Sequence, residues 1–369
     1  MRIAYITDID LNAHSGVRLK HVMQCGNWEK LGHEVVIFSM PNTEQVNISK
    51  VDIPIKHKIF DNKIASYFGG GFKAYCRKIL SIPSVLRALR DYNPDFVYLR
   101  SMIYFPGLIR ILNAYPTFIE YNTLVEEELK MVSSFKTRLM HGMGYEHLNK
   151  SARGFIGVTN EITQYYRDKY AKPSIAIGNG FDLNSYPDQT LKSKNQRPQL
   201  VFVGSPDMPW QGVDKFYQMS QRIEADFHLV GPSISDSLGC KDNFFQHGYL
   251  QKNLLDALYL KMDIAVGSLA LHRKKMSEAT PLKVREYCAY GLPIILAYND
   301  TDLSGQEFVL EIDNTEDTID KNIQRIKDFI QKWHNRRVPR QNVIPLIDYS
   351  VKERIRLNFI KDVLDNNGV

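Results

Sequence analysis

Two glutamates, Glu278 and Glu286, stand eight positions apart and flank the start of a predicted helix in the run Glu-Ala-Thr-Pro-Leu-Lys-Val-Arg-Glu. Pro281 suits a first helical turn, where its missing N–H would have no partner anyway. Backbone N–H groups at a helix start suit a phosphate, and two separate carboxylates suit sugar hydroxyls. The spacing alone also fits a plainer interpretation, in which Glu278 is a solvated surface residue before an ordinary helix, turn and strand.

The sequence around this pair favours the chemical interpretation. The predicted helix ends at Gly291, and Pro293 opens an apolar strand. With this pattern the chain resembles glycosyltransferase family 4, the retaining, nucleotide-sugar-dependent enzymes of GT-B fold, over nearly its whole length. The other matching segments, in family order, are Ser15-Gly16, Leu31-Gly32-His33-Glu34-Val35, Asn179-Gly180-Phe181-Asp182, Val201-Phe202-Val203-Gly204 and His228-Leu229-Val230-Gly231.

The elements that would position these residues alternate between short β-rich runs and longer helical patterns, which predicts parallel sheets with helical crossovers. We expect strands near 2–7, 34–39, 95–99, 117–120, 154–158, 199–204, 227–230, 244–247, 263–266 and 293–297. Helices are expected in the first half near 17–31, 72–91, 103–113, 124–150 and 160–170.

This alternation predicts an α/β protein with two doubly wound, Rossmann-like domains facing each other across a cleft. Ligands of such sheets gather at the carboxyl ends of the strands. By resemblance, 1–172 would bind the acceptor and 173–349 the nucleotide sugar, with the polar segment 187–198 leading into the second domain. The C-terminal helix, 350–369, is assigned to the first domain by resemblance; a helix capping the second domain is the alternative.

Composition agrees with a soluble protein of this size. A chain of 369 residues is long enough for two domains, and 44% hydrophobic with 24% charged residues is ordinary for a globular protein. The net charge of +6 favours anionic ligands without indicating nucleic acid. We find no signal peptide, no apolar run long enough to span a membrane and no Cys-x-x-Cys pair, so we expect a cytoplasmic protein with reduced cysteines.

The resemblance implies a donor site. Glu286 would accept hydrogen bonds from ribose hydroxyls, and Glu278 would bind hydroxyls of the transferred sugar. Backbone amides along Thr280, Pro281, Leu282 and Lys283 would meet the diphosphate. Gly16, capped by Ser15, and Gly204 would let the backbone approach the donor.

The chain departs from the family where the diphosphate would lie. Relatives carry an Arg directly after the strand that ends at Gly204 and a Lys five residues later; here Ser205 and Gln211 take these places. Three explanations stay open: other cations compensate, the donor lacks a full diphosphate, or the enzyme is slow or degenerate. We favour compensation by Arg273 and Lys283.

In the first domain, Asn122 stands where many relatives carry a His near the reacting sugar. An amide can orient a hydroxyl but cannot act as acid or base, which suits a front-face retaining reaction. Glu120 could serve the acceptor, or pair with a neighbour such as Arg100. Asp8 and Asp10 form an Asp-x-Asp motif, but we expect no metal, because the architecture is of the metal-independent kind.

A basic, amphipathic stretch between Tyr67 and Arg90 could rest on an anionic membrane, where lipid-linked acceptors are found. Its alternative is a packed helix with a charged outer face. The sequence therefore predicts a cytoplasmic, metal-independent, retaining glycosyltransferase without cofactor, and it leaves peripheral contact with the inner face of the cell membrane open. The acceptor would be a glycan or lipid-linked glycan in surface polysaccharide biosynthesis. A nucleotide-sugar-binding subunit with weakened activity and a GT-B sugar epimerase are the alternatives.

Overall fold

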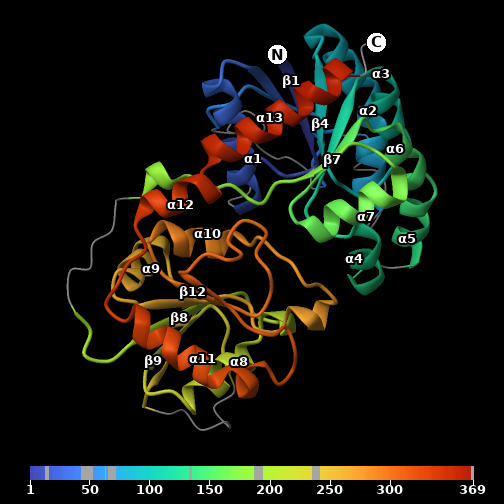
Figure 1. The fold of residues 1–369 in the computed structure, drawn as a ribbon. Coiled ribbons are helices and arrows are strands. Elements are labelled where there is room, and N and C mark those ends of the chain that lie inside the picture. Colours follow the sequence, from blue (N-terminus) through green and yellow to red (C-terminus); the bar gives the residue numbers. More distant parts are fainter. Residues whose placement is uncertain are drawn as a thin grey trace. The chain divides into compact units, whose positions relative to one another are not determined.

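The computed structural model describes residues 1–12, 16–42, 53–62, 64, 72–132, 135–186, 194–234 and 242–366. The chain divides into two units (Figure 1). The first unit comprises Met1–Gly180 and Lys352–Val369, and the second comprises Phe181–Val351. Because β7 (Ser174–Ala176) belongs to the first sheet, the division falls eight residues after the expected boundary at 172.

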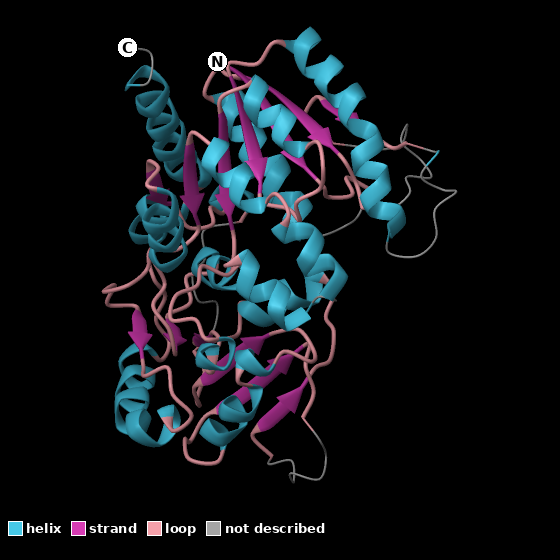
Figure 2. Cartoon of the chain, turned by 90° about the vertical axis from the view of Figure 1, so that its right-hand side faces the viewer, coloured by secondary structure: helices cyan, strands magenta, loops and turns pink. Residues whose placement is uncertain are grey.

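The first unit is built on a seven-stranded sheet in which all neighbouring strands run parallel, in the order β3-β2-β1-β4-β5-β6-β7. Its strands are β1 (Arg2–Thr7), β2 (Glu34–Ser39), β3 (His57–Ile59), β4 (Phe96–Arg100), β5 (Thr117–Tyr121), β6 (Gly154–Gly157) and β7. Its helices are α1 (Gly16–Lys30), α2 (Phe72–Tyr92), α3 (Leu108–Ala114), α4 (Val125–Val132), α5 (Phe135–Gly142), α6 (Tyr145–Ser151) and α7 (Asn160–Tyr170). Figure 2 shows these helices around the sheet.

The C-terminal helix α13 (Tyr349–Asn366) contributes to the core of the first unit. Its apolar residues Leu357, Ile360 and Val363 pack in one buried cluster with Trp28 of α1 and with residues of β1, β4 and β5. Trp28 Nε1 also donates a 2.7 Å hydrogen bond to Glu353 of α13. The prediction that this helix returns to the first domain is therefore confirmed.

The second unit repeats the plan with a six-stranded parallel sheet in the order β10-β9-β8-β11-β12-β13. Its strands are β8 (Gln199–Val203), β9 (Asp226–Val230), β10 (Phe244–Gln246), β11 (Ile264–Val266), β12 (Ile294–Leu296) and β13 (Val309–Glu311). Its helices are α8 (Val213–Ser220), α9 (Lys252–Tyr259), α10 (Leu282–Ala289), α11 (Thr318–Trp333) and α12 (Arg340–Ile347).

Two predicted helices are wrong in extent, and a glycine or proline stands at one break in each. The helix expected at 103–113 begins only at Leu108, because Pro106 and Gly107, with φ of +98°, precede it. The helix expected at 124–150 is three helices, α4 to α6. Gly144 stands before α6, where a Cβ atom would lie 2.1 Å from the ring of Tyr104.

Candidate functional site

Helix α10 starts as the sequence predicts. Pro281 is its N-cap with extended backbone, and no side chain caps the helix start. The preceding loop is anchored, because Glu278 forms a bridge to Asn299 and the Ala279 N–H donates to the Asn299 carbonyl at 3.2 Å. This segment thus holds Glu278 and an uncapped helix start close together along a short, fixed stretch of chain.

Glu286 lies on α10 among three donors. The hydroxyl of Tyr259 donates to its Oε2 at 3.0 Å, the hydroxyl of Tyr186 to its Oε1 at 3.5 Å, and Lys252 Nζ lies 3.5 Å from Oε1. The side chain is 17% exposed. Since a carboxylate offers about four lone-pair sites, Glu286 keeps capacity for further hydroxyl donors.

The loop after β8 begins at Gly204, and Gly231 follows the neighbouring strand β9. A Cβ atom on Gly204 would lie 2.2 Å from Gln211 Oε1, and one on Gly231, with φ of +94°, would lie 2.1 Å from the Gly204 carbonyl oxygen. The Ser205 N–H donates to Gln211 Oε1 at 3.2 Å. Gln211 therefore orders the loop, and neither Ser205 nor Gln211 brings a positive charge to it.

Lys283 brings a cation to the end of β8. From the first turn of α10, its Nζ donates to the carbonyl of Val203 at 3.1 Å and lies 4.2 Å from the centre of the Phe202 ring. Burial lowers the pKa of Lys283 to about 7. The hydroxyl of Tyr287, one turn later, accepts a hydrogen bond from the Val203 N–H at 3.0 Å. Side chains of α10 therefore bind both the N–H and the carbonyl of Val203.

Arg273 departs from the prediction. Its side chain makes five hydrogen bonds, to both carboxylate oxygens of Asp214, to both of Glu316 and to the Pro209 carbonyl, all between 2.7 and 3.0 Å. A guanidinium has five N–H donors, so no donor remains for a phosphate in this arrangement. The expectation that Arg273 supplies the missing charge is wrong for this structure, because two carboxylates outside the motif already neutralise it.

Glu120 also differs from the prediction. Its carboxylate is fully buried, with Lys20 Nζ at 2.6 Å, the Tyr98 hydroxyl at 2.5 Å and Arg356 Nη2 at 3.5 Å. Lys20 and Arg356 hold the pKa of Glu120 well below its usual range, against the effect of burial. A carboxylate so paired is a poor base and is closed to an acceptor, and its partners are not the Arg100 that the alternative named.

The other predicted residues of the first unit lie near this network. Asn122 is partly buried; its amide donates to Glu120 at 3.1 Å, and its oxygen accepts from Lys20 at 2.9 Å. Asp8 pairs with Lys78 at 2.7 Å. Gly16 is the first residue of α1, whereas its predicted cap, Ser15, lies outside the described residues.

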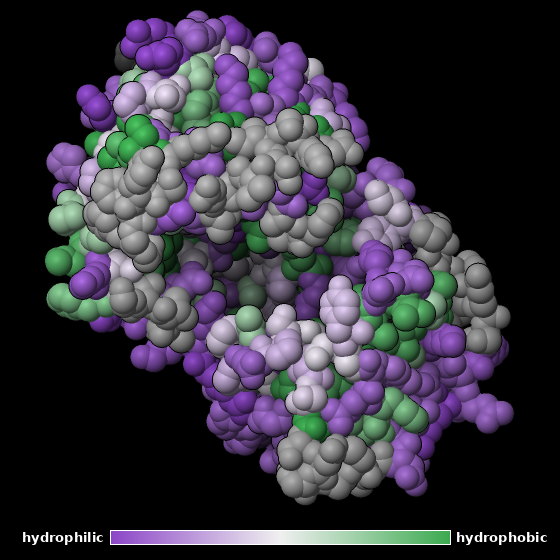
Figure 3. Space-filling view, turned by 180° about the vertical axis from the view of Figure 1, so that it is seen from behind, coloured by the Kyte–Doolittle hydropathy of each residue, from purple (hydrophilic) through white to green (hydrophobic). Residues whose placement is uncertain are grey.

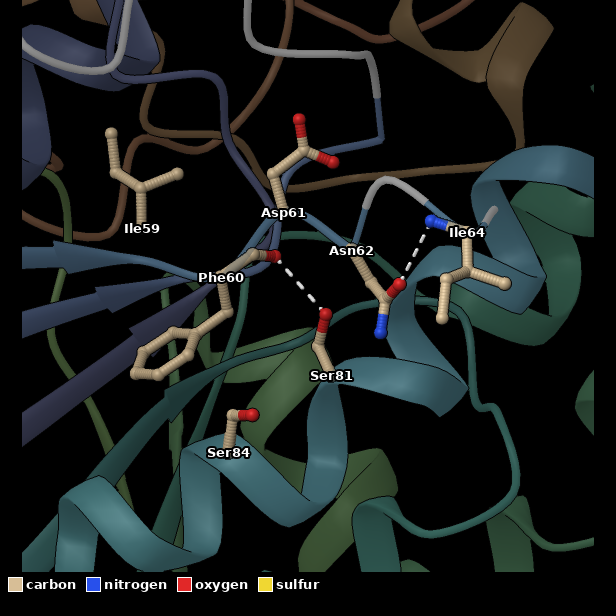
Figure 4. Close-up of a pocket in the computed structure, with 7 residues that line it drawn as sticks. All are labelled: Ile59, Phe60, Asp61, Asn62, Ile64, Ser81 and Ser84. Atoms are coloured by element: carbon tan, nitrogen blue, oxygen red, sulfur yellow. Dashed lines mark hydrogen bonds between the residues drawn. The ribbon is translucent and has the colours of Figure 1, made fainter. Parts of the chain in front are cut away.

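Helix α2 presents only part of the basic face that the sequence suggested, since Arg87 and Arg90 are exposed whereas other cations are not. Arg77 and Lys78 are buried and pair with Asp61 and Asp8. A pocket of about 380 Å³ opens beside α2, where Ser81 donates to the Phe60 carbonyl at 3.2 Å (Figure 4). Within the described residues no helix is long and apolar enough to cross a membrane, and no group of three or more metal-ligating side chains gathers.

The structure adds residues that the sequence analysis missed. Around Glu286 they are Tyr186, Lys252 and Tyr259; around Glu120 they are Lys20, Tyr98 and Arg356. They are spread over 336 positions of the chain and belong to no local motif. One feature of the sequence could have pointed to the network around Glu120: Lys20 places a cation within the apolar pattern of the first helix. Cys25, Cys76 and Cys288 are free and buried, while Cys240 lies outside the described residues.

Comparison with known proteins identifies the fold. No protein-family model and no curated sequence matches the chain. Solved structures match it over nearly its whole length: a sucrose-phosphate synthase from Thermosynechococcus elongatus (15% identity, 99% of both chains, TM-score 0.65) and the lipopolysaccharide outer core galactosyltransferase WaaB (13%, 98% and 99%, TM-score 0.64). Anabaena Alr3699/HepE in complex with UDP and glucose also matches (13%, 98% and 100%, TM-score 0.59). The chain therefore has the two-domain GT-B fold that the sequence predicted.

Proposed function

We propose that this protein is a retaining glycosyltransferase that transfers a sugar from a nucleotide-diphosphate donor to a glycan or lipid-linked glycan acceptor, without a metal ion, in surface polysaccharide biosynthesis. The observation that carries the proposal is the α10 segment, where Glu278, an uncapped helix start and the partly exposed Glu286 lie within nine residues. The GT-B fold and the UDP present in the solved HepE structure support a UDP-sugar as the first donor to test.

In this proposal each group of the donor has a partner in the second unit. Glu286 accepts the ribose hydroxyls, and Glu278 accepts hydroxyls of the sugar. The amides of Leu282 and Lys283 at the α10 start bind the diphosphate, and the Lys283 ammonium stabilises the charge that builds on it as the glycosidic bond breaks. Arg273 is left out because its donors are occupied.

The acceptor reaction needs little from the protein. In a front-face transfer the leaving phosphate takes the proton of the attacking hydroxyl, so the protein has only to orient that hydroxyl. Asn122 can do this with the amide hydrogen and oxygen lone pair that Glu120 and Lys20 leave over. Glu120 then acts as a positioning residue for Asn122, not as a base.

Peripheral contact with an anionic membrane is part of the proposal, and α5 fits it better than α2. Phe135, Leu139 and Met143 follow one another at four-residue spacing and are 71%, 58% and 66% exposed. The exposed Lys136 and Arg138 lie between them in sequence. Exposed apolar side chains beside cations suit the headgroup region of an anionic bilayer. On the face shown in Figure 3 hydrophilic residues predominate, and hydrophobic residues gather in smaller patches.

Donor binding tests the function directly. We expect UDP to raise the thermal stability of the full chain and one UDP-sugar to be turned over when acceptor glycan is supplied. Tight binding of UDP-sugars with neither hydrolysis nor transfer would favour the binding subunit. Release of nucleotide with an epimerised free sugar would favour the epimerase. If no nucleoside diphosphate stabilises the protein, the proposed function is wrong.

Vesicle sedimentation tests the membrane contact. We expect the protein to sediment with phosphatidylglycerol vesicles at low salt and less with phosphatidylcholine vesicles, and Phe135→Ser with Leu139→Ser to remove most of this binding. Leu254→Ser is the matched control, because Leu254 is 54% exposed on α9 without this pattern. Equal sedimentation of the two variants would exclude α5 as the contact surface.

A further inference from the structure

A buried polar layer lies at the carboxyl end of the first sheet. Side chains alternate along a strand, so Tyr98 and Arg100 of β4 lie on one face of the sheet. That is the face covered by α1 and α13, since Tyr98 packs with Trp28 and accepts from Arg356 Nε at 2.9 Å. Arg100 is the last residue of β4 and stands opposite Glu120 of β5 in register.

The charges of this layer do not balance. Its carboxylates are Glu120 and Glu353, and its cations are Lys20, Arg356 and Arg100. Lys20 pairs with Glu120, and Arg356 pairs with both carboxylates. Among the residues described here, none forms a hydrogen bond or ion pair with Arg100, although its Nε is buried. The layer therefore holds one cation more than its carboxylates, and this cation, Arg100, is partly buried.

The surplus charge acts on its neighbours. Burial is the main cause that lowers the pKa of Lys20, and Arg100 lowers it further against the opposing effect of Glu120. The pKa of His21 is lowered to about 3, first by burial and then by Arg100. Repulsion of this kind costs free energy, and a bound anion would relieve it.

We propose that Arg100 binds an oxyanion of a substrate, either a carboxylate or phosphate of the acceptor or a phosphate of the donor. The planar guanidinium suits such groups, because two parallel N–H donors match two oxygens. The position suits a ligand, because parallel α/β sheets bind ligands at the carboxyl ends of their strands. The proposal rests on the proposed function only in calling the oxyanion part of a substrate.

An oxyanion titration of the full chain tests the binding. It is run without nucleotide and repeated with saturating UDP, which should abolish the effect if the site holds a donor phosphate and leave it if the site holds an acceptor oxyanion. At constant ionic strength we expect sodium phosphate or sodium glucuronate, but not chloride, to raise the melting temperature. The rise should be on the order of 2 °C at ten times Kd. Arg100→Ala should abolish this rise and Arg100→Lys should keep part of it. Arg90→Ala, which removes an exposed arginine of α2, should leave it unchanged.

The melting temperature without oxyanion separates binding from a structural role. Arg100→Ala removes an uncompensated cation, so we expect the unliganded variant to melt at the same temperature as the wild type or higher. A clear fall in the melting temperature of the unliganded variant would instead mean that Arg100 holds the fold together, and would overturn the proposal.

Nucleotide binding identifies the source of the oxyanion. If Arg100→Ala weakens UDP binding about tenfold, the oxyanion belongs to the donor; if it leaves UDP binding unchanged but loses the phosphate effect, it belongs to the acceptor. If the variant keeps both the phosphate effect and the UDP affinity of the wild type, the proposal is wrong. Should the wild type bind no nucleotide, the proposed function fails, and the phosphate titration without UDP still decides the role of Arg100.

Discussion

Each unit places a glutamate in its candidate site, and the two glutamates stand in opposite surroundings. Glu120 is fully buried and accepts from Lys20, Tyr98 and Asn122 at 3.1 Å or less. Glu286 keeps 17% of its side chain exposed, and among the described residues only the Tyr259 hydroxyl donates to it from as close as 3.0 Å. The comparison teaches that a carboxylate in a site is available to a ligand only when its own neighbours leave lone pairs free.

The two cations of the second unit differ in the same way. Arg273 is saturated by Asp214 and Glu316, whereas Lys283 has a carbonyl oxygen and an aromatic ring around its ammonium group. A cation neutralised by carboxylates adds little attraction for a phosphate. A cation held by neutral groups keeps its attraction for a phosphate, but burial without a carboxylate lowers its pKa.

The largest expected effect is on stability at Glu120. Glu120→Ala leaves Lys20 and Arg356 buried without a carboxylate, so we expect the free energy of unfolding of the first unit to fall by about 3–5 kcal/mol. Urea denaturation followed by tryptophan fluorescence measures this change, because Trp28 lies in the same core. A loss below about 1 kcal/mol would show that the network contributes little.

Glu286→Ala should show the reverse pattern. We expect the affinity for UDP to fall about 10- to 100-fold, because charge-assisted hydrogen bonds to ribose contribute about 1.5–3 kcal/mol. The unfolding free energy should change far less than in Glu120→Ala. Isothermal titration calorimetry measures the affinity, with Glu307→Ala, a surface change in the same unit, as control. Unchanged affinity would remove Glu286 from the donor site.

Variants of Lys283 and Arg273 test which of the two cations contributes to donor binding. Lys283→Met should weaken UDP-glucose binding about tenfold, through loss of one charge-assisted contact of roughly 1.4 kcal/mol. Arg273→Ala should leave the affinity within about twofold and reduce stability by at most about 1 kcal/mol, as usual for exposed ion pairs. A larger loss of affinity in Arg273→Ala than in Lys283→Met would show that Arg273, and not Lys283, contacts the phosphate.

The smallest effect is a dependence on pH. Since the pKa of Lys283 is lowered to about 7, the ammonium group loses its proton as pH rises above 7. Affinity for UDP-glucose should then fall as the pH rises above that pKa, by no more than the tenfold expected for Lys283→Met. UDP-glucose is the probe because its diphosphate lacks the terminal phosphate that titrates near pH 6. Lys283→Arg should bind with little pH dependence, and an equal slope in both proteins would contradict the assignment.

The lowered pKa of Lys283 also determines how the free energy of unfolding changes with pH. The unfolded chain keeps the lysine protonated up to about pH 10.4, whereas the folded chain releases the proton near 7. Stability should therefore rise with pH between these values, unlike donor affinity, which should fall.

All the interior strands were predicted, whereas three of the four edge strands were not. All three strands that the sequence analysis missed, β3, β7 and β13, are three-residue strands at the edge of a sheet, and none has a fully buried run of residues. Interior strands such as β4 carry continuous apolar runs, because helices cover both of their faces. Hydrophobic pattern reports burial, so it fails where burial is partial.

The sequence by itself determined the two doubly wound sheets and the α10 segment with its two glutamates, and its resemblance to a known family predicted the return of α13 to the first unit. Each of these depends on patterns within one stretch of chain or on the order of such stretches. Only the tertiary structure decided that Glu120 and Arg273 are occupied while Lys283 and Arg100 have no carboxylate partner among the described residues. The ion-pair partners of a charged side chain come from distant parts of the chain, as Arg356 does for Glu120. The strength of such a pair depends on the distance between the charges in space, which cannot be read from the order of residues.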